Sequence, residues 1–156
     1  MKTLVVYVSV HHGNTEKVAR AIAGELGADL VTIDGARQAD LKAYDLICFG
    51  SGIFFGKHHK SLLEFVENLP HGEGKKAFVF STSGKGDPAQ NAFLKDLLKK
   101  KGYAVIGEFA CKGWDSWGPF RIIGGINKGR PNESDLEEAK EFARGLKERF
   151  RTTSSS

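Results

Sequence analysis

The sequence contains little cysteine and no long apolar run. Its 156 residues include two cysteines, Cys48 and Cys111, whose wide separation matches neither a redox motif nor a zinc-binding spacing. No apolar run approaches the roughly 18 residues that a membrane-spanning helix needs, and no signal-peptide pattern precedes the first apolar segment. We therefore expect no membrane insertion, a reduced cytoplasmic location and a core position for Cys48.

Acidic residues are in the minority. The 19 Asp and Glu residues are outnumbered by 23 Lys and Arg, which gives a net charge of +4. The densest basic patch, Lys99-Lys100-Lys101, closes a predicted helix, where cations complement the helix dipole. This patch lacks the interleaved aromatic residues of a nucleic-acid site, so we expect no nucleic-acid partner. The positive field instead favours an acidic protein partner.

The chain does contain a regular alternation of apolar runs and amphipathic segments. The runs predict five strands, at residues 4–8, 28–33, 45–49, 77–80 and 103–110, and Asp34-Gly35 is expected to end the second. Several are apolar throughout, which is typical of a parallel sheet covered by helices on both faces. We therefore predict one α/β domain over residues 1–151, followed by a polar tail over residues 152–156.

Two of the predicted helices have specific features. In the helix that closes at Lys101, the expected buried stripe consists of Phe93, Leu94, Leu97 and Leu98. The last helix is expected to begin near Asn132 or Ser134, where Ser134 and Glu137 have the spacing of a capping box.

The segment after the first strand predicts an anion site. Gly13-Asn14-Thr15 turns the strand into a helix, and the first N–H groups of a helix are unpaired and point outward. Gly13 permits close approach of the backbone, and Asn14 and Thr15 can cap the helix or donate to the anion. The alternative is an ordinary capped turn of an α/β protein.

Three further loops are expected at the same edge of the sheet. They are the polar or glycine-rich segments after the third, fourth and fifth strands, and each follows a carboxyl end. Ligands of such sheets bind beyond the carboxyl ends, at the point where the strand order reverses. The sequence thus predicts one site built from several loops.

These segments together resemble the flavodoxin family, and the resemblance covers essentially the whole chain. The family's phosphate loop reads Thr/Ser-x-Thr-Gly-Asn-Thr, where this chain has Val10-x-His12-Gly13-Asn14-Thr15. The resemblance implies a flavodoxin-like doubly wound three-layer sandwich. Its five-stranded parallel sheet would have the order 2-1-3-4-5.

The resemblance also implies FMN as the cofactor. The first loop would hold the phosphate, Phe54 or Phe55 would pack beside the flavin ring, and Trp114 would cover the other ring face. Alternatively, Trp114 is a core plug under the long loop that follows. The cofactor contacts that the resemblance implies are Ser9, His11, His12, Gly13, Asn14, Thr15, Ser51, Gly52, Ile53, Phe54, Phe55, Gly56, Lys57, Ser81, Thr82, Ser83, Gly84 and Trp114.

Three functions are compatible with these residues. The leading hypothesis is an FMN-binding electron carrier between redox protein partners, a reductase and an acceptor. The second is a reductase, dependent on NAD(P)H or on a partner, that acts on a quinone or flavin. The third is a flavodoxin fold without flavin that binds a metal or a partner. In its metal form His11-His12 and His58-His59 would bind zinc or copper, and the alternative is that these histidines are ordinary loop residues or contact the phosphate.

Flavodoxins are typically acidic, and this chain is basic, with Lys57 and Lys85 in the candidate loops. Positive charge favours the anionic reduced flavin, so we expect a less negative potential for the second reduction step than is typical of the family.

Overall fold

Five parallel strands form the centre of the molecule. The structure, a computed structural model, describes residues 1–10, 12–114 and 126–154. The strand order is β2-β1-β3-β5-β6, which confirms the predicted topology because the additional strand β4 pairs only with β3. The parallel strands are β1 (Thr3–Val8), β2 (Asp29–Thr32), β3 (Leu46–Phe54), β5 (Lys76–Ser83) and β6 (Ala104–Lys112). The antiparallel strand β4 comprises Lys57–His58.

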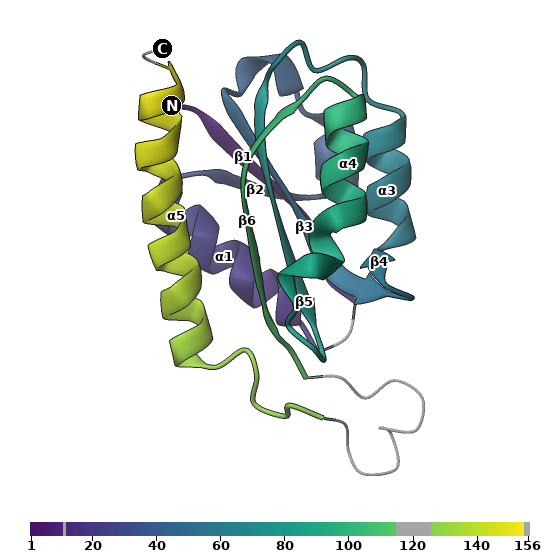
Figure 1. Cartoon of the computed structure of the whole chain (residues 1–156), viewed down its shortest axis with the longest axis vertical. Coiled ribbons are helices and arrows are strands. Elements are labelled where there is room, and N and C mark those ends of the chain that lie inside the picture. The colour runs from purple at the N-terminus through teal and green to yellow at the C-terminus, as the bar shows by residue number, and fades with distance from the viewer. Residues whose placement is uncertain (11, 115–125, 155–156) are drawn as a thin grey trace.

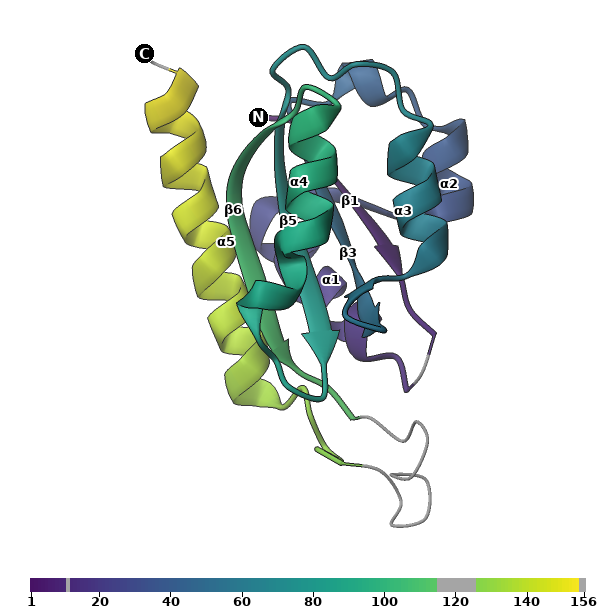
Figure 2. The same ribbon diagram turned by 45° about the vertical axis from the view of Figure 1, so that its right-hand side comes forward.

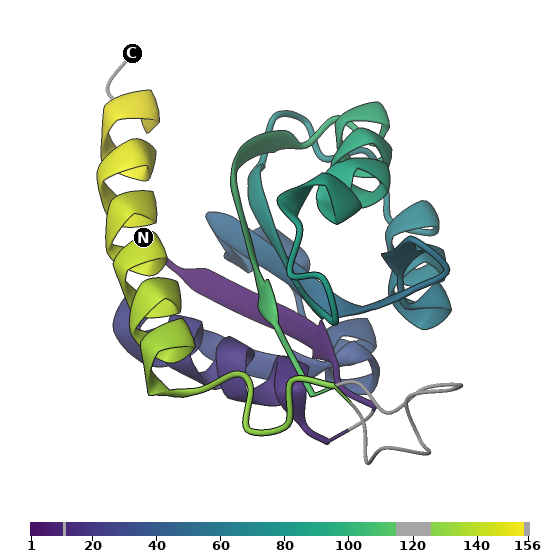
Figure 3. The ribbon, with the colours of Figure 1, turned by 60° about the horizontal axis from the view of Figure 1, so that its bottom comes forward.

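Helices cover both faces of the sheet, so the three-layer prediction is confirmed. Helices α1 and α5 pack on one face, and α2, α3 and α4 pack on the other (Figures 1 and 3). The α-helices are α1 (Asn14–Leu26), α2 (Ile33–Gln38), α3 (Lys60–Glu67), α4 (Ala92–Lys100) and α5 (Glu133–Ser154). Two 3₁₀ turns, η1 (Leu41–Ala43) and η2 (Pro88–Asn91), precede β3 and α4.

The core is divided by the sheet into two apolar clusters. Successive side chains of a strand point to opposite faces, so Leu4 packs with α3 while its neighbour Val5 packs with α1. Cys48 is fully buried on the α1 side, which confirms its predicted core role. Burial raises the pKa of its thiol well above the ordinary value, so the thiol stays protonated and inert.

Two local predictions about helices were wrong. The second strand ends before Asp34-Gly35, as expected, but Ile33, expected in the strand, begins helix α2, which also contains Asp34 and Gly35. Phe93, expected in the buried stripe of α4, is 41% exposed because Leu94 and Leu98 already fill that side of the sheet.

The capping box of α5 was also misplaced by two residues. The N–H of Asp135 donates to Oδ1 of Asn132 at 2.9 Å, and the N–H of Asn132 donates to Oδ2 of Asp135 at 2.8 Å. Asn132 is therefore the capping residue, in place of Ser134. At its other end α5 continues to Ser154, so residues 152–154, predicted as part of the tail, are helical.

The carboxyl ends of β1, β3 and β5 reach the same edge of the sheet (Figure 2). The start of α1 lies at this edge as well. Among the described helices, none is long and apolar enough to cross a membrane.

Candidate functional site

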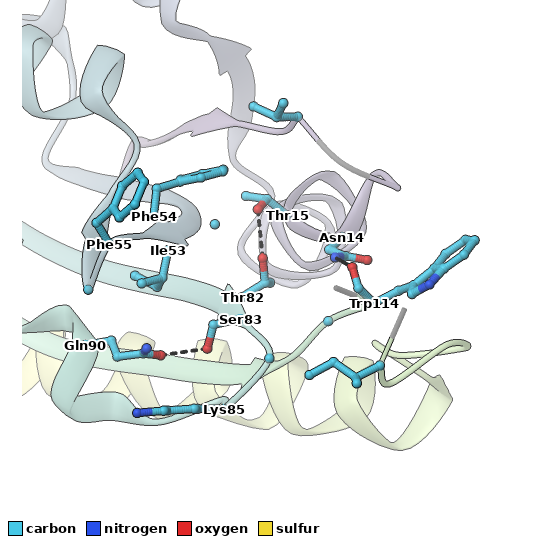
Figure 4. A pocket seen from close by; sticks show the side chains of 16 residues that line it. Asn14, Thr15, Ile53, Phe54, Phe55, Thr82, Ser83, Lys85, Gln90 and Trp114 are labelled. Atoms are coloured by element: carbon cyan, nitrogen blue, oxygen red, sulfur yellow. Dashed lines mark hydrogen bonds between the residues drawn. The ribbon is translucent and has the colours of Figure 1, made fainter. Parts of the chain in front are cut away.

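A cavity of about 500 Å³ lies at the carboxyl edge of the sheet. Phe54 and Phe55 lie on one side, Asn14 and Trp114 lie on the other, and Thr15 and Thr82 lie between them (Figure 4). Its lining residues are Val10, Asn14, Thr15, Gly52, Ile53, Phe54, Phe55, Gly56, Thr82, Ser83, Gly84, Lys85, Gln90, Gly113, Trp114 and Ile126. The structure therefore brings together residues from the loops after β1, β3, β5 and β6.

The side of the cavity with the phenylalanines is a β-hairpin, which the sequence pattern had indicated as a loop. Strand β3 continues to Phe54 and returns through β4, with Phe54 opposite Lys57. The two turn residues Phe55 and Gly56 have φ values of +53° and +80°, and two positive φ values are typical of a tight two-residue hairpin turn. Phe55 is 92% exposed at this turn.

The first turn of α1 forms the opposite side. His12 and Gly13 both have positive φ, at +57° and +67°, and they turn the chain sharply from β1 into the helix. Oγ of Ser9 accepts the N–H of Glu16 at 3.3 Å. The N–H groups of Asn14 and Thr15 have no acceptor among the described residues. The start of the helix, with these two backbone N–H groups and the positive end of its dipole, therefore lies beside the cavity.

Three polar side chains stand beside these donors. The hydroxyls of Thr15 and Thr82 are 2.9 Å apart, so one donates to the other and one hydroxyl proton remains for an outside acceptor. Nδ2 of Asn14 donates to the carbonyl oxygen of Trp114 at 2.8 Å. Oδ1 of Asn14 is buried without a partner among the described residues.

The loop after β5 completes the base of the cavity. Oγ of Ser83 donates to Oε1 of Gln90 at 2.6 Å and accepts the N–H of Gly86 at 2.8 Å. Lys85, in the same loop, is exposed and is the only charged residue among the described residues that line the cavity.

Trp114 is held from both neighbouring segments. The backbone N–H of Trp114 donates to the carbonyl oxygen of Arg130 at 2.9 Å. The backbone N–H of the preceding Gly113 donates to the carbonyl oxygen of Ser83, also at 2.9 Å. The indole stacks on the imidazole of His12, with ring centroids 3.6 Å apart. Trp114 is therefore at the cavity, as expected, but in this structure one face of its ring packs on His12.

Several predicted site residues lie outside this cavity. Ser51 and Ser81 are buried within their strands. Ser9 and Gly13 line a second cavity, also of about 500 Å³, at the carboxyl ends of β1 and β2 and beside the starts of α1 and α2. Lys57 extends over the ring of Phe93, with Nζ 4.3 Å from the centroid. His11 lies outside the described residues.

The histidines of the second pair have structural roles. His58 is 1% exposed and donates from Nε2 to the carbonyl oxygen of Phe80 at 2.9 Å. Burial lowers its pKa to about 4. His59 caps α3, because its Nδ1 accepts the N–H of Ser61 at 3.0 Å. In the described ranges no group of three or more His, Cys, Asp or Glu side chains is arranged to hold a metal ion.

Comparison with known proteins identifies the family. Residues 4–113 match the model of the flavodoxin domain. The chain belongs to the flavodoxin family. It is also 49% identical over 150 residues to an uncharacterized protein of Methanocaldococcus jannaschii, a match that covers 94% of this chain and 98% of the other. The flavodoxin of Haemophilus influenzae is 27% identical over 114 residues, 66% of each chain.

Solved structures agree with the fold of this flavodoxin-family chain. A flavodoxin from the domain Archaea superposes with a TM-score of 0.68 at 20% identity, covering 97% of this chain and 99% of the other. A Lactobacillus acidophilus flavoprotein in complex with FMN has a TM-score of 0.52 at 23% identity, covering 69% of this chain and 91% of the other.

The predicted contacts omit five lining residues of this family member: Val10, Lys85, Gln90, Gly113 and Ile126. Gln90 reaches the cavity only because η2 folds back over Ser83, and Ile126 is brought in by the return of the chain toward α5. Gly113 could have been found, because it directly precedes the predicted contact Trp114.

Proposed function

We propose that this flavodoxin-family protein binds FMN in the cavity at the carboxyl edge and carries electrons between redox proteins. The proposal is carried by a large apolar cavity that adjoins the start of α1, where the N–H groups of Asn14 and Thr15 have no acceptor among the described residues. FMN has an anionic phosphate at one end and a flat aromatic ring system at the other, and these match the helix start and the apolar part of the cavity. The flavodoxin relative and the FMN-bound flavoprotein support the same cofactor.

The phosphate end fits the donors that are present. The N–H groups of Asn14 and Thr15, the spare hydroxyl proton of the Thr15–Thr82 pair and the helix dipole all favour a dianion. None of these requires a lysine. The backbone and hydroxyl donors of this loop would therefore bind the phosphate without a neighbouring positive side chain.

The ring end fits the apolar side of the cavity. Ile53, Phe54 and Phe55 line it, and an aromatic contact contributes about 0.5–1.5 kcal/mol beyond area burial. The volume of about 500 Å³ lies in the range that is usual for cofactor sites.

When bound, the flavin supplies the redox chemistry, and the residues of the cavity bind it, orient it and limit its contact with water. No His, Cys, Asp, Glu or Tyr side chain is among the described residues that line the cavity. A reductase that moves protons to a substrate usually places such an acid or base at the reacting atoms. This lining favours the carrier over the reductase.

A variant of the first loop tests the binding site. We expect Asn14→Ala combined with Thr15→Val to weaken FMN binding at least tenfold, since it removes the side-chain donors beside the helix start. The measurement is quenching of flavin fluorescence during titration of the flavin-free protein. The matched control is Asn68→Ala with Thr152→Ala, two exposed positions away from the cavity. Equal affinity of both variants, with folding verified by circular dichroism, would contradict the proposal.

Steady-state kinetics separate the two candidate activities. A carrier oxidises NAD(P)H only when a separate reductase is added, whereas a reductase turns over NAD(P)H with a quinone by itself. Turnover by the purified FMN-loaded protein alone would replace the carrier with the reductase.

A further inference from the structure

The mouth of the cavity combines exposed apolar side chains with lysines. Among the described residues four large apolar side chains are exposed, and three of them, Val10, Phe55 and Phe93, lie at or beside this cavity. Val10 is 53% exposed and Phe55 is 92% exposed, on different loops at the mouth. Exposed apolar groups gathered in this way are typical of an interaction surface.

Lysines surround this apolar patch. Lys85 lines the cavity, Lys57 covers Phe93, and Nζ of Lys128 lies 5.5 Å from the ring centroid of Trp114. All three are exposed, and none has a carboxylate partner within the described ranges. We name this surface, made of Val10, Phe55, Lys57, Lys85, Phe93 and Lys128, the lysine rim.

The carboxylates at the same edge are mostly engaged in other contacts. Glu16 accepts from the hydroxyl of Tyr7 at 3.0 Å and pairs with Arg20. Asp87 caps η2 by accepting the N–H of Ala89 at 2.9 Å. The rim as defined contains three lysines and no carboxylate, so its own charge is positive and has the same sign as the net charge of the chain.

We propose that the lysine rim is the docking surface for a redox protein whose own contact face carries carboxylates around an apolar patch. Complementary charge steers such a partner to the cavity mouth, and the apolar centre excludes water once the two faces meet. A partner seated on the rim would lie next to the cavity in which the flavin is proposed to bind. This proposal rests on the electron-carrier function.

A binding experiment with two probe proteins of opposite charge tests the rim. The ¹⁵N-labelled chain is titrated with ferric cytochrome b5, an acidic haem protein, and separately with cytochrome c, a basic one. We expect cytochrome b5 to bind in low salt, to shift the amide signals of Gly56, Lys57, Lys85 and Lys128, and to be released by added salt. Cytochrome c is expected to bind at least tenfold more weakly.

Two triple variants give the matched comparison. The first variant reverses the charge of the rim by Lys57→Glu, Lys85→Glu and Lys128→Glu. It should weaken cytochrome b5 binding at least tenfold and strengthen cytochrome c binding. Lys42→Glu with Lys99→Glu and Lys100→Glu makes the same change of net charge at exposed positions toward the opposite end of the strands. That control should stay within about threefold of the unmodified chain.

The outcomes distinguish the rim from the proposed function. The titrations are run with and without FMN, and FMN loading is measured separately by absorbance. If FMN does not bind but cytochrome b5 still docks at the rim, the carrier function fails and the surface stands. Four results would each overturn the docking surface. They are equal weakening of cytochrome b5 binding by both triple variants, preferential binding of cytochrome c, no binding of cytochrome b5, and amide shifts at the opposite edge.

Discussion

At the scale of single residues, Gly113 fixes the position of the Asn14 side chain. A Cβ atom at residue 113 would lie 2.6 Å from Nδ2 of Asn14, which real contacts do not reach. Gly113→Ala must therefore displace the Asn14 amide and break its bond to Trp114. We expect FMN affinity to fall roughly tenfold, equivalent to about 1.4 kcal/mol, while the thermal midpoint changes little. Unchanged FMN binding in the fluorescence titration would show that Asn14 does not contribute to the site.

The buried imidazole of His58 makes stability dependent on pH. Its pKa is about 4 in the folded protein, because burial disfavours the charged ring, and about 6.5 in the unfolded chain. The unfolded state therefore binds the proton more readily, so this contribution is fully present above pH 6.5 and is lost as the pH falls toward 4. The loss amounts to roughly 3 kcal/mol at most.

Denaturant titrations between pH 7 and pH 4 measure this effect. The unmodified chain should lose more stability over this range than His58→Gln, in which the titrating group is absent. A slope that is the same in both proteins would show that His58 is not the responsible group.

At the scale of elements, the ring of Phe80 on β5 lies over Gly50 on β3, so Gly50 cannot carry a side chain. A Cβ atom there would lie 2.1 Å from the ring of Phe80, on the neighbouring strand. Both strands lie in the centre of the sheet, so neither can move away. We expect Gly50→Ala to reduce the free energy of unfolding by about 3 kcal/mol, at the upper end of the cost of overpacking.

An alanine substitution at one further glycine supplies the control. Gly24 lies on the exposed side of α1, and a Cβ atom added there would meet no neighbour within 4 Å. Gly24→Ala should therefore be neutral or stabilising by up to about 1 kcal/mol, because alanine favours the helix more than glycine does. Urea unfolding measures both variants. If Gly50→Ala and Gly24→Ala had the same free energy of unfolding, the packing of Phe80 against Gly50 would be contradicted.

The elements that the sequence predicted are those whose pattern is set by burial. Strands β1, β3 and β5 are apolar because they are covered on both faces, so their runs were recognised. The β3–β4 hairpin was missed because its turn uses Phe55 at positive φ, which phenylalanine rarely adopts. Helix α2 was missed because it is short and contains Gly35, a residue that disfavours helices.

At the scale of the whole molecule, the sheet topology places the loops of the site at one edge. Parallel strands bring their carboxyl ends together, so the convergence of the loops after the first, third, fourth and fifth predicted strands could be predicted from the chain order alone. Contacts between loops could not be predicted in this way. Examples are the Ser83–Gln90 hydrogen bond and the stacking of His12 on Trp114. Each joins side chains of separate segments whose relative positions the sequence pattern does not specify. The expected less negative potential of the second reduction step stays a prediction.

The central claim is that the start of α1 binds the phosphate of FMN, and comparing FMN with riboflavin tests it most directly. The two ligands share the ring and the sugar chain, and only FMN carries the phosphate. Titration of the flavin-free protein should show one FMN bound per chain, with riboflavin bound at least a hundredfold more weakly. Equal affinity for the two ligands would mean that the phosphate is not held at α1, and no binding of either would contradict the flavin site itself.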